Sequence, residues 1–109
     1  MKIERGEIWW INLGPTVGRE IKKRRPCVVI SANTINRLRS TPVVIPLSSS
    51  PETAPPIVVS VQSGGENSVA VIDQIRAVDK SRFVSKAGSV SSQDLKLIEL
   101  ALKQVLQIG

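Results

Sequence analysis

Glu20 and Arg25 are the two side chains whose types and spacing first suggest chemistry, because both lie in one polar, basic segment of the sequence. A carboxylate can act as a general base, and a guanidinium can stabilise negative charge that develops on a phosphate oxygen. Arg25 also precedes Pro26, and a residue before proline is steered into extended conformations, so the direction of its side chain is partly fixed. The plainer interpretation is that both residues are solvated surface charges.

The composition removes the more familiar hydrolytic sites. The chain has no histidine and one cysteine, which excludes Ser-His-Asp and Cys-His catalysis, the usual zinc sites and an intrachain disulfide. Cleavage of RNA still fits the remaining residue types, because the 2′-hydroxyl of RNA is its own nucleophile. Such a reaction needs a base, a cation at the phosphate and a proton for the leaving oxygen. The sequence thus predicts neither a metal nor a cofactor, and Cys27 is expected to be buried packing.

Charge is concentrated in the first half of the chain. The formal net charge is +6, and residues 1–50 hold nine Lys and Arg against three acids, whereas residues 51–109 hold six of each. Five of those nine basic residues fall between Arg19 and Arg25. A patch of this kind is typical of proteins that bind a polyanion, nucleic acid first among them. A solvated surface or a docking site for an acidic protein segment are the alternatives.

The size of the chain suits one domain over residues 1–109. At 109 residues with 41% hydrophobic content, it can bury a single core without disulfides. No segment approaches the roughly 20 apolar residues of a membrane span, and the first residues are charged where a signal peptide is apolar. We therefore expect a soluble, reduced, cytoplasmic protein.

The elements that would position these residues are strands followed by one helix. Short β-branched and aromatic runs between Gly and Pro residues predict strands over 7–13, 26–31, 43–47, 57–61, 69–72 and 74–78. Pro46 inside its run indicates an edge strand or a bulge, and a short helix is expected around Arg37 and Arg39. The fold class is therefore mainly β with a C-terminal helix, built as a small curled sheet or barrel.

The tail changes to a helical period. Residues 91–94 are similar to a capping box, in which the serine hydroxyl and the acid each satisfy an early backbone amide. Apolar residues then recur on one face, and Leu97 and Leu100 fall outside that stripe, where they either widen the core or mark a subunit contact. Earlier in the chain, Trp9 and Trp10 are neighbours on a strand, so one is expected to face inward and the other outward.

Several ordered segments together resemble a known family. From about Arg5 to Leu106 the sequence is similar to the MazF/PemK toxins, and the matching segments are residues 5–9, 13–20, 23–29, 43–48 and 68–80 and the closing helix. The resemblance implies an SH3-like small β-barrel of the CcdB/MazF-like toxin fold, and a homodimer. It also implies a sequence-specific endoribonuclease that cleaves single-stranded mRNA without metal and leaves 2′,3′-cyclic phosphate and 5′-hydroxyl ends. A cognate acidic MazE-like antitoxin would block the active groove.

The resemblance assigns roles to individual residues. Arg25 falls on the family's Arg-Pro motif and is expected to bind the scissile phosphate, where charge stabilisation is its main role because arginine does not normally deprotonate. Glu20 is the candidate base, and Ser48 falls where a threonine hydroxyl is usual, so it keeps the hydrogen bond and loses a methyl group. The expected RNA-binding residues are Arg19, Lys22, Lys23, Arg24, Asn33, Ser68, Asp73 and Gln74.

Three other interpretations stay open. A small barrel with a basic groove can hold single-stranded nucleic acid without cutting it, although two tryptophans and one phenylalanine make a poor stacking platform. A CcdB-like toxin would poison gyrase, but those resemble one another at a C-terminal Trp-Gly-Ile that is absent here. A degenerate toxin would keep the fold and lose the activity, and the serine at position 48 keeps that possibility open. Base specificity is expected in the grooves beside residues 14–25 and 48–56.

Overall fold

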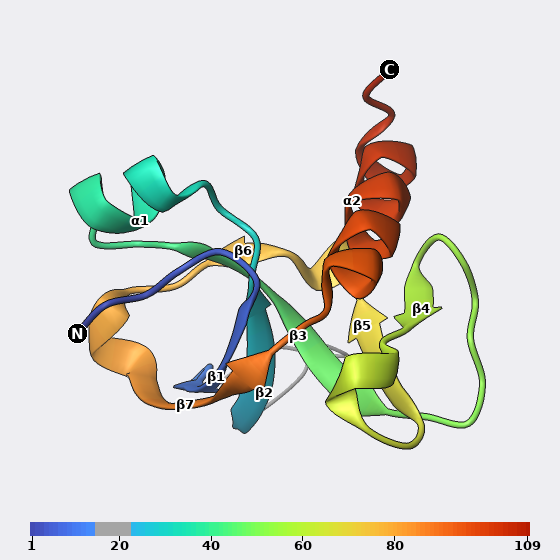
Figure 1. Cartoon of the computed structure of the whole chain (residues 1–109), viewed down its shortest axis with the longest axis horizontal. Helices are drawn as coiled ribbons and strands as arrows, with labels where there is room; N and C mark the ends of the chain where they lie inside the picture. The colour runs from blue at the N-terminus through green and yellow to red at the C-terminus, as the bar shows by residue number, and fades with distance from the viewer. Residues whose placement is uncertain (15–22) are drawn as a thin grey trace.

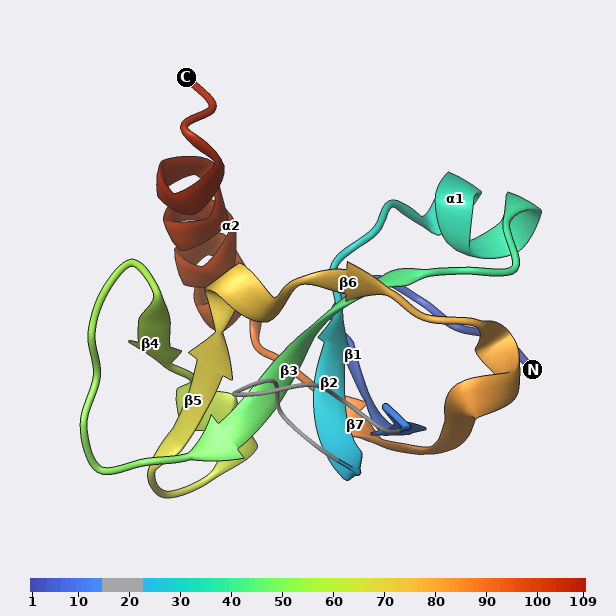
Figure 2. The same cartoon turned by 180° about the vertical axis from the view of Figure 1, so that it is seen from behind.

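A computed structural model describes residues 1–14 and 23–109, in which a curved antiparallel sheet lies against one long helix (Figures 1 and 2). The strands are β1 Glu7–Asn12, β2 Arg24–Val29, β3 Val43–Ser49, β4 Val58–Ser60, β5 Ser68–Val71, β6 Arg76–Ala77 and β7 Phe83–Ser89. The helices are α1 Asn33–Leu38 and α2 Ser92–Leu106, and 3₁₀ turns occupy η1 Gln62–Gly64, η2 Ile72–Gln74 and η3 Lys80–Arg82. None of the helices in these residues is long and apolar enough to cross a membrane.

The strands pair in the order β4-β5-β3-β2-β1-β7, and β6 pairs with β3. All the pairs are antiparallel, which confirms the mainly β class with a C-terminal helix. The sheet curls but does not close, because in the described residues β4 and β7, the two ends of this order, are not paired with each other. Strand β3 lies at the centre and so connects the two halves of the sheet.

The prediction that Pro46 marks an edge strand or a bulge is wrong. Pro46 is fully buried opposite Cys27 of β2. On its other side β3 pairs first with β6, at Val43 and Val44, and then with β5 from Leu47 onward. The proline thus lies where β3 changes partner, so a central strand accommodates a residue that cannot donate to a ladder.

Two further strand predictions need correction. The run 74–78 forms the end of η2 followed by the two-residue β6, and β2 begins at Arg24, two residues earlier than expected. Strand β7 was not predicted, because its sequence is polar, contains Gly88 and shows little alternation. It forms because β1 pairs with it from Glu7 to Ile11, with two irregularities in the register. Tertiary pairing therefore overrides weak intrinsic preference.

The sheet buries apolar residues on both faces. One cluster joins the sheet to α2 and includes Ile45, Leu47 and Ile98. The other lies on the opposite face, and in it Trp9 packs edge-on against Phe83 with ring centroids 5.7 Å apart. Trp9 is 8% exposed and Trp10 is 40% exposed, which confirms that the two neighbours face opposite ways.

Cys27 is buried within the second cluster, as predicted. Burial raises the pKa of its thiol to about 12, with a smaller opposing effect of Arg76. The thiol is therefore uncharged at neutral pH and behaves as a small apolar side chain.

Two buried acids tie distant elements together. The carboxylate of Glu7 accepts hydrogen bonds from the Glu4 amide at 2.8 Å and from Nε1 of Trp9 at 3.0 Å, and it pairs with Nζ of Lys86 at 2.9 Å. Burial works to raise the pKa of Glu7, but the bonds from Lys86, the Glu4 amide and Trp9 outweigh it and hold the pKa below its ordinary value. Glu7 thereby joins the N-terminal turn to β1 and β7.

Asp94 performs the same task at the start of α2. The hydroxyl of Ser91 accepts a hydrogen bond from the Asp94 amide at 3.0 Å, which confirms the predicted serine cap. In place of the expected capping box, the Ser91 amide donates to the Ser63 hydroxyl at 3.1 Å. The acid accepts hydrogen bonds from the Ser63 amide at 2.8 Å and from the Ser63 hydroxyl. Burial works to raise the pKa of Asp94, and these bonds outweigh it and lower the pKa. The helix is thus anchored to η1.

Candidate active site

Arg25 and Ser48 lie at the same end of neighbouring strands. Pairing between β2 and β3 ends at Cys27 and Pro46, and the strands are antiparallel, so two residues before Cys27 and two after Pro46 lead in the same direction. Figures 1 and 2 both show the start of β2 and the tip of β3 at the lower edge of the molecule. Alternation along each strand places both side chains on the face that Cys27 and Pro46 share.

Arg25 is exposed, and its guanidinium has no partner within residues 1–14 and 23–109. It stands opposite Ile11 in the β1–β2 pair, which holds its backbone extended, as its place before Pro26 predicts. In the described part of the chain no hydrogen bond or ion pair engages its guanidinium, whereas the guanidinium of Arg5 bonds to the Ile30 carbonyl at 3.0 Å and pairs with Glu99. The part of the chain that the structure describes therefore leaves the guanidinium donors of Arg25 for a ligand.

Lys23 and Arg24 lie at the start of β2, beside the end of β1. The Leu13 amide donates to the Lys23 carbonyl at 3.0 Å, and Arg24 pairs with Asn12. The backbone of both basic residues is therefore held at the end of the β1–β2 pair. Both side chains are exposed, and Lys23 has a φ of +67°. Arg19, Glu20 and Lys22 lie outside the described residues. The exposed cations Lys23, Arg24 and Arg25 are thus consecutive at one end of the sheet.

A cavity of about 300 Å³ opens beside Ser48. The strands β3, β5 and β4 contribute Ser48, Val69, Val71 and Val58, and the segment after β3 contributes Ser50, Glu52, Thr53 and Ala54. The sequence analysis named Ser48 and expected a groove beside residues 48–56, but it singled out none of the other residues that line this cavity. Their sequence signal is weak, because a loop rich in serine and proline gives no spacing that identifies a site.

The remaining predicted residues are divided among three places. Ser68 is buried at the start of β5 opposite Ser49, next to the Ser48 end of the sheet. Asp73 and Gln74 lie in η2, beyond the other end of β5. Asn33 begins α1, past the far end of β2, and its side-chain oxygen accepts the Arg5 amide at 2.7 Å. The structure therefore brings the backbone of Ser68 near Ser48, with its side chain on the opposite face of the sheet. It does not bring Asn33, Asp73 or Gln74 to the Arg25 end of one chain.

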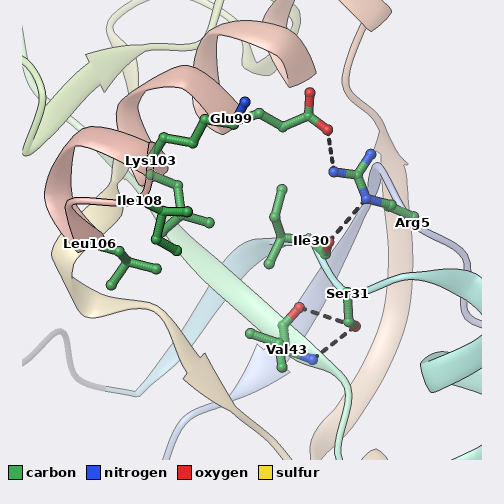
Figure 3. A pocket seen from close by; sticks show the side chains of 9 residues that line it. Arg5, Ile30, Ser31, Val43, Glu99, Lys103, Leu106 and Ile108 are labelled. Carbon is green, nitrogen blue, oxygen red and sulfur yellow. Dashed lines mark hydrogen bonds and ion pairs between the residues drawn. The ribbon is translucent and has the colours of Figure 1, made fainter.

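A second cavity, of about 490 Å³, lies along the last turns of α2 (Figure 3). Ile30, Val43, Leu106 and Ile108 give it an apolar lining, and Arg5, Glu99 and Lys103 surround it with charge. None of the predicted site residues that the structure describes lines this cavity. The larger volume is therefore not where the exposed cations and the Ser48 hydroxyl lie.

The sequence matches the family model described as the PemK-like, MazF-like toxin of type II toxin–antitoxin systems, over residues 4–106. It is 32% identical to Endoribonuclease MazF9 of Mycobacterium tuberculosis over 97% of this chain and 98% of the relative. It is also 36% identical to Endoribonuclease PemK of Escherichia coli over 71% of this chain, where the match spans 61% of the relative.

Solved structures share the fold. MazF from Deinococcus radiodurans aligns with a TM-score of 0.84 and 23% identity over 99% of both chains. A MazE–MazF structure from the same organism aligns with a TM-score of 0.79 and 22% identity over 100% of this chain and 99% of that chain. The chain belongs to the family of PemK-like, MazF-like toxins of type II toxin–antitoxin systems.

Proposed function

We propose that this chain is a metal-independent endoribonuclease toxin that cuts single-stranded mRNA at short sequences. The observation that carries the proposal is the placement of the exposed Arg25 guanidinium and the Ser48 hydroxyl at one open end of the sheet, beside two further exposed cations. The names of relatives that match along most of this chain, such as Endoribonuclease MazF9, support the same activity. The substrate places the toxin in the cytoplasm, where mRNA is translated.

The reaction needs little from the protein. The 2′-oxygen of the RNA forms a bond to phosphorus, its proton passes to a base, and the bond from phosphorus to the 5′-oxygen breaks. That oxygen takes up a proton, which leaves a 2′,3′-cyclic phosphate and a 5′-hydroxyl. The guanidinium of Arg25 stabilises the charge on the phosphoryl oxygens, and two parallel N–H groups suit two such oxygens. Ser48 donates a hydrogen bond to the same group, and Glu20 acts as the base.

The neighbouring basic residues hold the strand. Arg19, Lys22, Lys23 and Arg24 provide contacts to RNA phosphates, which position the substrate without reading its sequence. Ser68 pairs with Ser49, so alternation directs its buried side chain to the face of the sheet away from Ser48. Asn33, Asp73 and Gln74 lie elsewhere on the chain. Their contribution to RNA binding therefore requires an RNA that extends over the molecule or a second copy of this chain.

The partners are a second copy and an antitoxin. Leu97 and Leu100 on α2 are 49% and 57% exposed, so this face of the helix offers apolar surface for a homodimer. A cognate acidic antitoxin of the MazE type fits the +6 charge, and the MazE–MazF structure with the same fold supports such a complex. Its acidic segment would cover the same cations that hold RNA.

Cleavage of a long single-stranded RNA in EDTA tests the proposal, with Arg25→Ala compared with the wild type. We expect metal-free cuts at a short recurring sequence, cyclic-phosphate ends in the wild type, and a rate at least about a hundredfold lower in the variant. Arg37→Ala is the matched control, because it removes an exposed arginine from α1 at the other end of β2. Equal cleavage by the Arg25 variant and the wild type would reject the assignment.

Binding without cleavage is the second candidate function, and the exposed cations Lys23, Arg24 and Arg25 favour it equally. The same experiment separates the two. A folded wild type that retains RNA and leaves it intact is a binding module or a degenerate toxin. A wild type that neither binds nor cuts RNA would favour a CcdB-like toxin that poisons gyrase.

A further inference from the structure

The cavity beside Ser48 combines an apolar floor with one acid. Ser48 stands opposite Val69, and Val58 stands opposite Val71. These residues alternate with Leu47, Val59 and Ala70, which pack in the cluster that joins the sheet to α2, so they face the other side of the sheet. Of the described residues that line the cavity, Glu52 is the one that carries a charge.

The backbone around Glu52 is held on both sides. The Ser50 amide donates to the Asn67 carbonyl at 2.8 Å, and the Ser50 hydroxyl accepts the Glu52 amide at 3.2 Å and donates to the Glu52 carbonyl at 3.0 Å. Ala54 then pairs with Val58 through bonds of 2.9 and 3.0 Å. The segment is therefore anchored to β5 and β4, and Glu52 is kept at the rim of the cavity.

A carboxylate at this place repels a phosphate group, but it does not repel a nucleobase. The protein carries a net charge of +6, and three exposed cations lie at the same end of the sheet, so the phosphates of a bound strand are expected there. A carboxylate near that path repels phosphate and attracts groups that donate hydrogen bonds. The nucleobase edge supplies such donors, and unstacked bases of single-stranded RNA are read in this way.

We propose that the cavity beside Ser48 binds a guanine that flanks the cleaved phosphate, and that Glu52 selects it. The inference rests on the proposed ribonuclease function, since it takes Ser48 as part of the cleavage site. The base lies over Val58, Val69 and Val71, and the carboxylate accepts the two neighbouring N–H groups of the guanine edge. Uracil, cytosine and adenine each lack that pair of adjacent donors, and a bidentate pair with a carboxylate is the stronger contact.

Cleavage of a randomised single-stranded RNA library, with the fragment ends sequenced, tests this assignment. We expect guanine to be enriched at one position next to the cut by the wild type, and this preference to fall about tenfold in Glu52→Gln. Inosine lacks one of the two donors, so replacing that guanine by inosine slows the wild type and changes Glu52→Gln little. Glu4→Gln is the matched control, because it makes the same change on the N-terminal turn, where Glu4 pairs with Lys2 at 3.3 Å.

Three results would overturn the assignment. The first is an unchanged guanine preference in Glu52→Gln, and the second is a wild type without guanine preference at any position near the cut. The third is a folded Glu52→Gln that loses cleavage at every sequence, because it would place Glu52 in the reaction itself. If the wild type does not cleave at all, the proposed function fails, and the binding of single-stranded oligonucleotides that carry either guanine or uracil at one position then decides. Base-independent binding rejects the cavity assignment, and binding that needs guanine and Glu52 retains it.

Discussion

Asp94 and Arg25 are both charged residues near the end of a regular element, but their surroundings differ. Asp94 is buried, accepts hydrogen bonds from Ser63 and anchors α2. Arg25 is exposed, and the described residues offer its guanidinium no partner. A charge that the fold satisfies belongs to the scaffold, whereas a charge that the fold orients and leaves unsatisfied is available to a ligand. Substitutions should therefore divide into those that change stability and those that change activity.

The largest expected effect on the scaffold side comes from Asp94→Ala. Removing the carboxylate leaves the Ser63 donors without their acceptor, and we expect the free energy of unfolding to fall by about 2–3 kcal/mol. Chemical denaturation measures this change, and cleavage per folded molecule should not change. Glu66→Ala, which removes an exposed acid, is the control and should alter stability little. A loss of cleavage activity without a loss of stability would contradict the assignment of Asp94 to the scaffold.

The same carboxylate predicts a dependence on pH. The pKa of Asp94 is lowered by folding, so its contribution is fully present above the unfolded value of about 3.9 and is lost as the pH falls through the lower folded value. Thermal melts of the wild type and Asp94→Asn should therefore differ most near neutral pH and converge in acid. A difference that grows on acidification would contradict this linkage.

Ser48→Ala is expected to have the next largest effect, on the activity side. The cleavage rate should fall by about tenfold with little change in RNA affinity or thermal stability, because the hydroxyl acts on the reacting phosphate. Ser48→Thr keeps the hydroxyl and should keep the activity, and Ser85→Ala on β7 controls for loss of an exposed hydroxyl. Equal small decreases in rate and affinity would assign Ser48 to packing.

The smallest effect is expected from Lys23. Its φ of +67° is better tolerated by asparagine than by alanine, so Lys23→Asn removes the charge with little backbone strain. Loss of one phosphate contact should reduce the slope of log affinity against log salt concentration by about 0.7 for a single strand. Lys96→Ala on the exposed side of α2 should leave that slope unchanged. An RNA affinity that does not depend on salt concentration would count against the assignment of Lys23 to an RNA phosphate.

Sequence patterns predicted most of the scaffold, and tertiary pairing accounts for the rest. The strands before residue 72 and the helix α2 carry strong apolar periodicity, and the structure contains them. Strand β7 and the central position of Pro46 depend on pairing with neighbouring strands, and a local sequence pattern does not reveal these partners. Arg25 could be named because Pro26 restricts it, whereas Glu52 could not, since only the folded segment brings it beside Val58, Val69 and Val71.

The buried position of Cys27 has a practical consequence. Its thiol lies between β1 and β3, opposite Trp9 on one side and Pro46 on the other, and burial raises its pKa to about 12. An alkylating reagent can therefore reach it only when the middle of the sheet opens. Since Arg25 and Cys27 share β2, the rate of thiol labelling would report how often the strand that carries the guanidinium leaves its native setting. Labelling of Cys27 would therefore measure the local opening of the sheet around β2.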